Sequence, residues 1–304
     1  FREAATKFLL ENTHKRSLQS DAERLKMLDG YIGDLALESI HMGSLLIYIA
    51  ARKKQGLKTR TINHGLQIVR HILNLAATEW MDEYGLTWLN TAPKIKLLPE
   101  HDARKPYPLN WEEQEQLFAA LPPHLREMAM FAVNTGCRDG EICNLRWEWE
   151  VLVGTHDIKS VFIIPSSQVK NGEERLVVLN RVAYEVIQRQ RGKHPEYVFI
   201  YRDKPIRHML NNGWRIARKR VGLAVRVHDL KHTFGRRLRA AGVLFEDRQD
   251  LLGHKSKRIT THYSRAELYN LWEAANAVCI EKSRPALTLL RTVAQQNCDR
   301  EKIM

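Results

Sequence analysis

The chain has 304 residues, of which 44% are hydrophobic and 27% charged, enough for one large soluble domain or two ordinary ones. The formal net charge of +13 predicts a polyanionic partner, with nucleic acid the first candidate and an anionic membrane the second. The sequence has no run of 18 apolar residues and no signal-peptide pattern, which argues against a membrane protein.

The cysteines form no CxxC pair, and there are only four of them: Cys137, Cys143, Cys279 and Cys298. This usage argues against a disulfide framework and a zinc site, and it favours the reducing cytoplasm. The chain begins with Phe1 instead of Met, so we expect that residues upstream have been removed, which leaves room for an additional N-terminal module.

The first ninety residues predict only helices, over residues 4–11, 20–33, 42–55 and 61–80. Ser20 and Thr61 are side chains that can cap the starts of two of them. In the last helix, Leu66, Val69 and Leu73 recur at a spacing that places them on one face. We therefore predict a small amphipathic helical bundle.

A dense basic run lies between the third and fourth predicted helices, and it consists of Arg52, Lys53, Lys54, Lys58 and Arg60. Such a run is either a solvated face or a turn that grips phosphates. Because the chain as a whole is basic, we favour DNA binding by these five residues.

Apolar periodicity stops over residues 91–110, a stretch that contains four prolines and several charges, as in a linker. We predict a helical domain over 1–92, a linker over 93–108 and a second domain over 109–304. Lys and Arg exceed Asp and Glu both before residue 107 (16 against 12) and after it (32 against 23). Two basic domains suit a protein that holds a duplex with both.

The second domain is predicted to be mainly helical with one small antiparallel β-sheet. Asn110 caps a helix that begins at Trp111, and further helices are expected over 124–134, over 139–146 and from Val182 to about residue 280. Residues 161–164 and 175–179 are prone to form strands, and Asn171 and Gly172 between them are typical of a hairpin turn. Residues 202–239 hold twelve Lys or Arg against two Asp, too many for a merely solubilising surface.

Two clusters in this domain suit phosphate chemistry but are weak signals alone. Arg138 lies in a glycine-flanked turn that opens a helix, where both the helix N-terminus and the guanidinium favour an anion. A helix cap with a surface arginine is the alternative there. Lys170 lies beside the Asn-Gly turn, where a lysine is usually just solvated.

Two further clusters contain histidine. His228 and Lys231 share a helix face, while His228 and His232 have the spacing of a helical zinc pair. The glutamate that a zinc hydrolase carries after its first histidine is absent, so we predict no metal. His254 ends the run Leu-Leu-Gly-His, and Tyr263 follows nine residues later. A lone tyrosine is normally a packing residue.

Together, these clusters resemble the active-site signature of the tyrosine recombinases, or integrases. The matching features are TG-x-R-x-GE, a lysine in a β-hairpin, H-x-x-R, LLGH and a tyrosine nine residues on. The similarity spans about residues 107–281, and the helical first domain resembles the core-binding domain of the family. The resemblance implies a two-domain, C-shaped clamp in which a helical core-binding domain is joined to an α+β catalytic domain.

Carried over residue by residue, the resemblance implies a catalytic set of Arg138, Lys170, His228, Lys231, His254 and Tyr263, with Glu141 as a supporting carboxylate. One position departs from the pattern, because Lys231 stands where H-x-x-R has arginine. A lysine keeps the charge but lacks the planar fork that binds phosphate with two hydrogen bonds. A DNA-binding protein of the same fold with weakened catalysis is therefore the leading alternative.

The implied reaction is attack of Tyr263 on a DNA phosphate to give a 3′-phosphotyrosine and a free 5′-hydroxyl, with Lys170 as general acid and His228 as base. It needs no cofactor, neither metal nor ATP. The implied partners are double-stranded DNA attachment sites, on which monomers assemble into a tetramer, and accessory DNA-bending or directionality proteins. The implied role is integration or excision of a phage or genomic island in the cytoplasm of a bacterial cell, at the nucleoid.

Two other enzyme classes are weighed against this interpretation. A type I topoisomerase would relax plasmids of any sequence, and a zinc hydrolase would bind stoichiometric zinc. After Tyr263, an apolar helical stripe is formed by Leu268, Leu271, Ala275 and Val278. It could pack on its own domain or dock on a neighbour, and we slightly favour docking.

Overall fold

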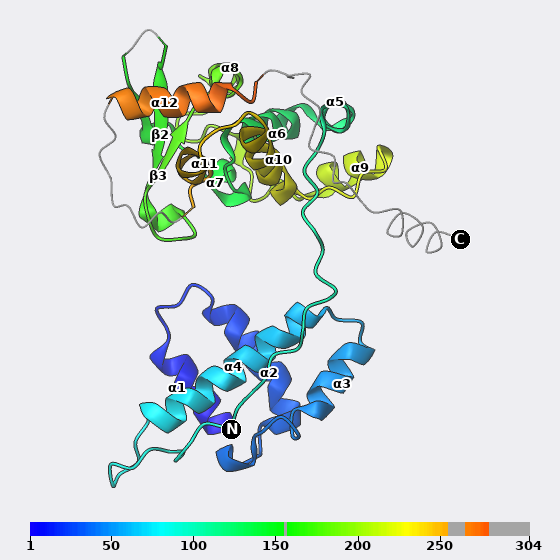
Figure 1. Cartoon of the computed structure of the whole chain (residues 1–304), viewed down its shortest axis with the longest axis vertical. Helices are drawn as coiled ribbons and strands as arrows, with labels where there is room; N and C mark the ends of the chain where they lie inside the picture. Colours follow the sequence, from blue (N-terminus) through cyan, green and yellow to red (C-terminus); the bar gives the residue numbers. More distant parts are fainter. Residues whose placement is uncertain (155–156, 255–264, 280–304) are drawn as a thin grey trace. The chain divides into compact units, whose positions relative to one another are not determined.

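The computed structural model describes residues 1–154, 157–254 and 265–279, and these form two compact units, Phe1–Lys105 and Pro106–Met304 (Figure 1). Tyr263, the predicted nucleophile, lies outside the described residues. None of the described helices is both long and apolar enough to cross a membrane.

Unit 1 is a bundle of four α-helices and one 3-10 helix: α1 (Arg2–Glu11), α2 (Leu18–Ile32), η1 (Leu37–Ser39), α3 (Leu46–Lys54) and α4 (Thr59–Thr78). The long helix α4 packs against the three other α-helices (Figure 1). Its face of Leu66, Val69 and Leu73 is fully buried, which confirms the predicted apolar face.

The two predicted caps in unit 1 are wrong. Ser20 and Thr61 lie inside α2 and α4, whose N-cap positions are held by Ser17 and Lys58 without a side-chain cap hydrogen bond. A capping residue has extended backbone, and Lys58 has it, whereas the N–H of Thr61 already donates to the Lys58 carbonyl within the first turn. The helices therefore begin before the polar residues that could have capped them.

The segment predicted to be a linker is attached to both units. Ile95 is buried in the core of unit 1, and the Asn63 side chain there donates to the Leu98 carbonyl and accepts from the Leu98 N–H, both at 2.8 Å. Farther along, the Tyr107 N–H donates to Asp229 in unit 2. The two ends of the predicted linker are therefore each anchored to the unit that they adjoin.

Unit 2 is mainly helical, with helices α5 (Trp111–Ala120), α6 (Pro123–Thr135), α7 (Asp139–Cys143), η2 (Trp147–Trp149), η3 (Ser166–Gln168), α8 (Arg181–Gln190), α9 (Asn212–Arg220), α10 (Val227–Ala240), α11 (Phe245–Leu252) and α12 (Arg265–Asn276). Helix α6 packs against α5, α7, α8 and α10 and forms the centre of the core (Figure 1). Asn110 caps α5 as predicted, since its side chain accepts from the Glu113 N–H at 2.7 Å, and the Glu113 carboxylate accepts from the Asn110 N–H.

Three antiparallel strands, β1 (Glu150–Leu152), β2 (Ser160–Ile164) and β3 (Arg175–Val178), form the sheet in the order β1-β2-β3. The predicted strand pair is confirmed, with Phe162 opposite Val177. The tight Asn-Gly turn is wrong, because residues 165–174 form a longer loop that contains η3 and is anchored by the buried Val169 side chain. Gly172 provides a left-handed bend (φ +74°) inside that loop.

Two other local predictions in unit 2 need correction. Helix α7 ends at Cys143 and not at Arg146, because Leu145 and Arg146 pair with the chain at Tyr197 and Val198. A second sheet, the two-stranded hairpin of β4 (Ile200–Tyr201) and β5 (Lys204–Pro205), was not predicted. Strands of two residues carry too short a pattern for periodicity to detect.

Helix α12 packs on its own unit, against α11 and β3 (Figure 1). Leu271, Ala275 and Val278 of the predicted stripe are buried with Phe234 and Leu238 of α10. This packing corrects our preference for docking of the stripe on a neighbour.

Candidate active site

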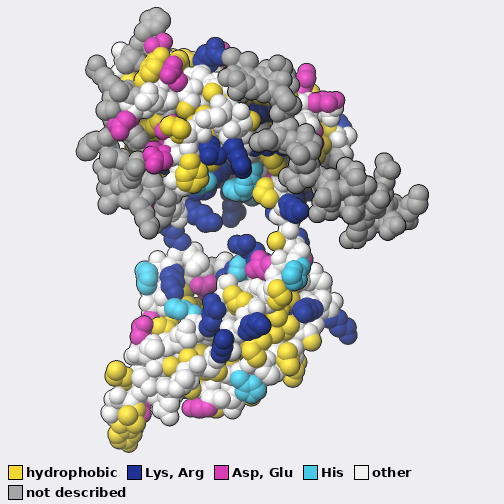
Figure 2. Space-filling model, viewed as in Figure 1, with side chains coloured by type: hydrophobic (Ala, Val, Ile, Leu, Met, Phe, Trp, Pro, Cys, Tyr) yellow, Lys and Arg dark blue, Asp and Glu magenta, His cyan; other side chains and the backbone are white. Residues whose placement is uncertain are grey.

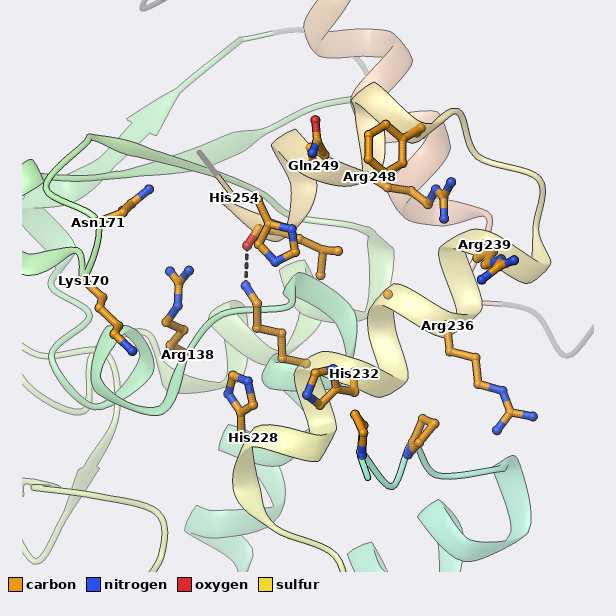
Figure 3. Close-up of a pocket in the computed structure, with 16 residues that line it drawn as sticks. Arg138, Lys170, Asn171, His228, His232, Arg236, Arg239, Arg248, Gln249 and His254 are labelled. Carbon is orange, nitrogen blue, oxygen red and sulfur yellow. Dashed lines mark hydrogen bonds between the residues drawn. The ribbon is translucent and has the colours of Figure 1, made fainter. Parts of the chain in front are cut away.

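A cavity of about 840 Å³ in unit 2 collects five of the predicted site residues. Figure 3 shows the side chains of Arg138, Lys170, His228 and His254 around it, and Lys231 also lines it. They come from the start of α7, the loop between β2 and β3, helix α10 and the end of α11. Figure 2 shows basic and histidine side chains gathered on the described surface of unit 2.

Arg138 is positioned by the junction between α6 and α7. Helix α6 ends at Gly136, whose left-handed backbone (φ +63°) turns the chain so that Arg138 becomes the N-cap of α7. The Arg138 guanidinium donates to Glu141 Oε1 at 2.7 Å, and its backbone N–H donates to Glu141 Oε2 at 2.7 Å. Nη2 of the guanidinium also donates to the Gly253 carbonyl at 3.3 Å, and Arg138 lines the cavity, where its charge favours an anion.

Glu141 is buried below the cavity and does not line it. Burial alone would raise the pKa of its carboxyl, but the charges of Arg175 and Arg138 and the Arg138 N–H outweigh burial and lower that pKa. Glu141 is therefore an ionised support for Arg138.

Lys170 is an exposed side chain in the loop between β2 and β3, next to Asn171 (Figure 3). The loop is held by the buried Val169, so Lys170 projects from a fixed base. An amine on a flexible stem at the edge of a cavity can reach a leaving oxygen there.

Helix α10 supplies a row of side chains to the cavity. His228 and His232 lie one turn apart, with ring centroids 4.9 Å apart in an edge-on arrangement. Partial burial, followed by the nearby His232 and Lys231, lowers the pKa of His228 below its ordinary value, so this imidazole is neutral at pH 7. Among the described residues, no group of three or more His, Cys, Asp or Glu is placed to hold a metal ion.

Lys231 is 5% exposed, and its ammonium points to two helix ends. Nζ donates to the carbonyl of Gly136 at 3.0 Å and to the carbonyl of Leu252. Burial first, then the charges of Arg175 and Arg138, lowers the pKa of Lys231 to about 7. Lys231 thus changes its charge near neutral pH, unlike an arginine.

His254 follows α11, which ends at Gly253 in a left-handed conformation (φ +57°). The His254 N–H donates to the Gln249 carbonyl at 3.0 Å, which fixes the chain where the ring enters the cavity. Partial burial and the charges of Lys231 and Arg138 lower the pKa of His254. Its neutral ring can donate one hydrogen bond to a ligand.

The remaining predicted site residues fall into two groups. Tyr263 lies outside the described residues. The predicted DNA-binding residues belong to unit 1, where Arg52, Lys53 and Lys54 form the last turn of α3 and Lys58 and Arg60 stand at the start of α4.

Sequence reasoning missed several residues of the cavity and its support. The rim includes three further arginines from α10 and α11: Arg236, Arg239 and Arg248 (Figure 3). Below the cavity, Arg175 is buried at the start of β3 and contacts Glu141. A signal existed for Arg175, since it alternates with Val177 on the buried face of a strand where arginine is rare.

Comparisons with known proteins point to one family. The sequence profile described as "Phage integrase family" matches residues 109–268. The integrase of Salmonella phage P22 is 26% identical over 318 residues, covering 91% of this chain and 79% of the relative. Tyrosine recombinase XerA of Pyrococcus horikoshii is 25% identical over 256 residues, covering 81% of each.

The fold is also similar to solved structures. A lambda integrase dimer bound to a COC′ core site matches with a TM-score of 0.67 and 18% identity, covering 86% of this chain and 98% of that one. A lambda integrase tetramer bound to a Holliday junction matches with a TM-score of 0.66 and 19% identity, covering 86% and 79%.

Proposed function

Because this chain belongs to the phage integrase family and is thus a site-specific recombinase that acts on DNA, we propose that it breaks and rejoins DNA strands through a covalent bond between Tyr263 and a DNA phosphate. One observation carries the proposal. Arg138, Lys170, Lys231 and two histidines come from separate segments of the chain and line one cavity. One of these histidines, His254, precedes Tyr263 by nine residues in the sequence.

The cavity suits phosphoryl transfer because that reaction needs positioning and charge neutralisation more than covalent help from the protein. In our proposal, Arg138, Lys231 and His254 donate to the non-bridging oxygens of the scissile phosphate. Arg138 is held for this by the buried Glu141, at 2.7 Å. Arg138 is thus in place before charge develops, which is the condition for electrostatic stabilisation.

In the first step, the Tyr263 oxygen forms a bond to phosphorus and the bond from phosphorus to the 5′-oxygen breaks. The phenolic proton passes to His228, whose neutral ring can accept it, and Lys170 protonates the leaving 5′-oxygen. The product is a 3′-phosphotyrosine and a free 5′-hydroxyl. A 5′-hydroxyl from another strand reverses the reaction, so the bond energy is kept and neither ATP nor a metal is needed.

We further propose that the reaction integrates or excises a phage or genomic island in a bacterial cytoplasm. Exchange of strands between two duplexes needs several active sites, and a lambda integrase tetramer is known on a Holliday junction. We therefore infer a tetramer assembled on attachment sites, with the basic residues at the α3–α4 junction holding the DNA backbone.

A suicide DNA duplex that carries the attachment core, read on a denaturing gel, tests the proposal. The unaltered chain should give a covalent adduct, and Tyr263→Phe should give none while duplex binding is kept. Tyr269→Phe is the matched control, because this half-exposed tyrosine lies on α12 and bonds only to Glu273 among the described residues. An adduct that persists in Tyr263→Phe would remove Tyr263 from its role.

A weakened, binding-only protein is the second candidate, and the contacts of Lys231 favour it. Its ammonium is occupied by the Gly136 and Leu252 carbonyls, and it lacks the fork of an arginine. If the unaltered chain binds the duplex without forming an adduct but Lys231→Arg forms one, the second candidate is correct.

A further inference from the structure

Arg175 is a buried arginine that does not line the cavity. It contacts the residues that hold Arg138 on one side of the cavity and His254 on the other. The residue is 3% exposed at the start of β3. Its Nη1 pairs with Glu141 Oε2. Its Nη2 lies 3.0 Å from the Gly136 carbonyl oxygen and 3.3 Å from the carbonyl oxygens of Thr135 and Leu251.

The contact with Glu141 leads to Arg138. Glu141 has two carboxylate oxygens, and Oε1 accepts from the Arg138 guanidinium while Oε2 accepts from the Arg138 N–H and from Arg175. Both Glu141 and Arg175 side chains are 2% exposed, so water cannot replace either partner. The Arg138 guanidinium is therefore tied to β3 through one carboxylate, and its Nη2 also donates directly to the Gly253 carbonyl at 3.3 Å.

The contacts with α11 lead to His254. The Leu251 carbonyl accepts from Arg175, and Gly253 packs closely against the Arg175 side chain, since a Cβ at Gly253 would lie 2.7 Å from Arg175 Nε. His254 is the next residue. Arg175 therefore sets how closely the end of α11 approaches β3, and with it where the His254 ring enters the cavity.

We propose that Arg175 is a positioning residue for DNA cleavage, which holds Arg138 and His254 at the separation that one scissile phosphate requires. The inference rests on the proposed function, because it concerns the same phosphate. A displacement of about 1 Å in such donors can cost about a hundredfold in rate. Arg175 would act without touching DNA, through Glu141 on one side and the end of α11 on the other.

The geometry requires arginine and not merely a positive charge. The planar guanidinium places one nitrogen on a carboxylate and another on the ends of two helices, whereas an ammonium is a single point. Arg175→Lys therefore keeps the charge and loses one of the two connections. Arg189→Lys is the matched control, because Arg189 on α8 is half-exposed and pairs with Glu127 away from the cavity.

The experiment measures single-turnover cleavage by the full chain on a suicide duplex with an ordinary scissile phosphate and on one with a methylphosphonate there. In the unaltered chain, replacing one non-bridging oxygen by a methyl group should slow cleavage strongly, because Arg138 and His254 then face a single, uncharged acceptor. In Arg175→Lys, cleavage of the ordinary duplex should fall about a hundredfold. The ratio of the cleavage rate of the ordinary duplex to that of the methylphosphonate duplex should fall toward one, while the affinity for DNA is unchanged. Arg189→Lys should show the same rates and the same ratio as the unaltered chain.

The ratio separates positioning from simple destabilisation, because a smaller folded fraction slows both substrates equally and leaves the ratio unchanged. An unchanged ratio, or cleavage equal to that of the unaltered chain, would overturn the proposal for Arg175. If Arg175→Lys does not fold, Gly253→Ala replaces it, since the added methyl would lie 2.7 Å from Arg175 Nε. Gly242→Ala is its control, because Gly242 has the same left-handed backbone strain but open space around it. Absence of any adduct in the unaltered chain would instead refute the proposed function.

Discussion

Raising the pH should remove the charge of Lys231 while the arginines of the cavity keep theirs. Burial and the charges of Arg175 and Arg138 lower the pKa of Lys231 to about 7. A lysine carries its charge below its pKa and loses it above, so stabilisation of the phosphate by Lys231 should be present at pH 6 and disappear as the pH rises through 7.

The size of the effect follows from that pKa. With a pKa of about 7, roughly 90% of Lys231 is charged at pH 6, roughly 10% at pH 8 and roughly 1% at pH 9. Arginine at the same position stays charged throughout this range. The rate of cleavage relative to that of Lys231→Arg should therefore fall about tenfold for each pH unit above 7.

The assay measures the second-order rate constant for cleavage of a suicide duplex. The duplex concentration is kept below its dissociation constant, because the rate constant then reports the ionisation of the free enzyme. A bound phosphate would raise the pKa of Lys231 and hide the titration. The two proteins differ only at position 231, so the ratio isolates the effect of that side chain. A ratio that stays constant from pH 6 to pH 9 would refute our account of Lys231.

Three other predictions concern binding and stability. Asn110→Ala should lower the free energy of unfolding by ~1 kcal/mol, measured by urea denaturation, because it removes the bond to Glu113 that caps α5. Lys58→Ala should weaken binding to DNA of any sequence and reduce the slope of log affinity against log salt by about one, measured by a salt titration. Leu271→Ala should cost ~2–5 kcal/mol in stability without DNA, measured by the same denaturation, because α12 packs on its own unit; Tyr269→Ala, at an exposed site, should cost little.

Local chemistry made part of the fold predictable. Asn110 and Glu113 are close in sequence, so their capping box could be read directly. The buried face of Leu66 and its neighbours follows from helical periodicity alone. Ser20 shows the limit of this reasoning, since a capping side chain fixes a helix start only where the backbone leaves the helical conformation.

The residues of the candidate site that belong to short sequence motifs could be predicted. Those that depend on contacts between distant parts of the chain could not. Arg138, His228 and His254 stand in short patterns that could be read without a structure. Arg175 acquires its role from Glu141, 34 residues away, and from Leu251, 76 residues away. No local pattern records such contacts, and only the rarity of a buried arginine in a strand pointed to it.

The buried charges around Lys231 explain why a lysine can occupy this position. Beneath the cavity, the Glu141 carboxylate pairs with both Arg138 and Arg175, and its negative charge also acts on the nearby Lys231. A third fixed charge would be costly there in the absence of an anion, and a lysine can avoid that cost by releasing its proton. A DNA phosphate would bring the missing negative charge and favour the protonated form again. Arginine would keep the cavity permanently charged, whereas Lys231 makes full charge depend on the arrival of DNA.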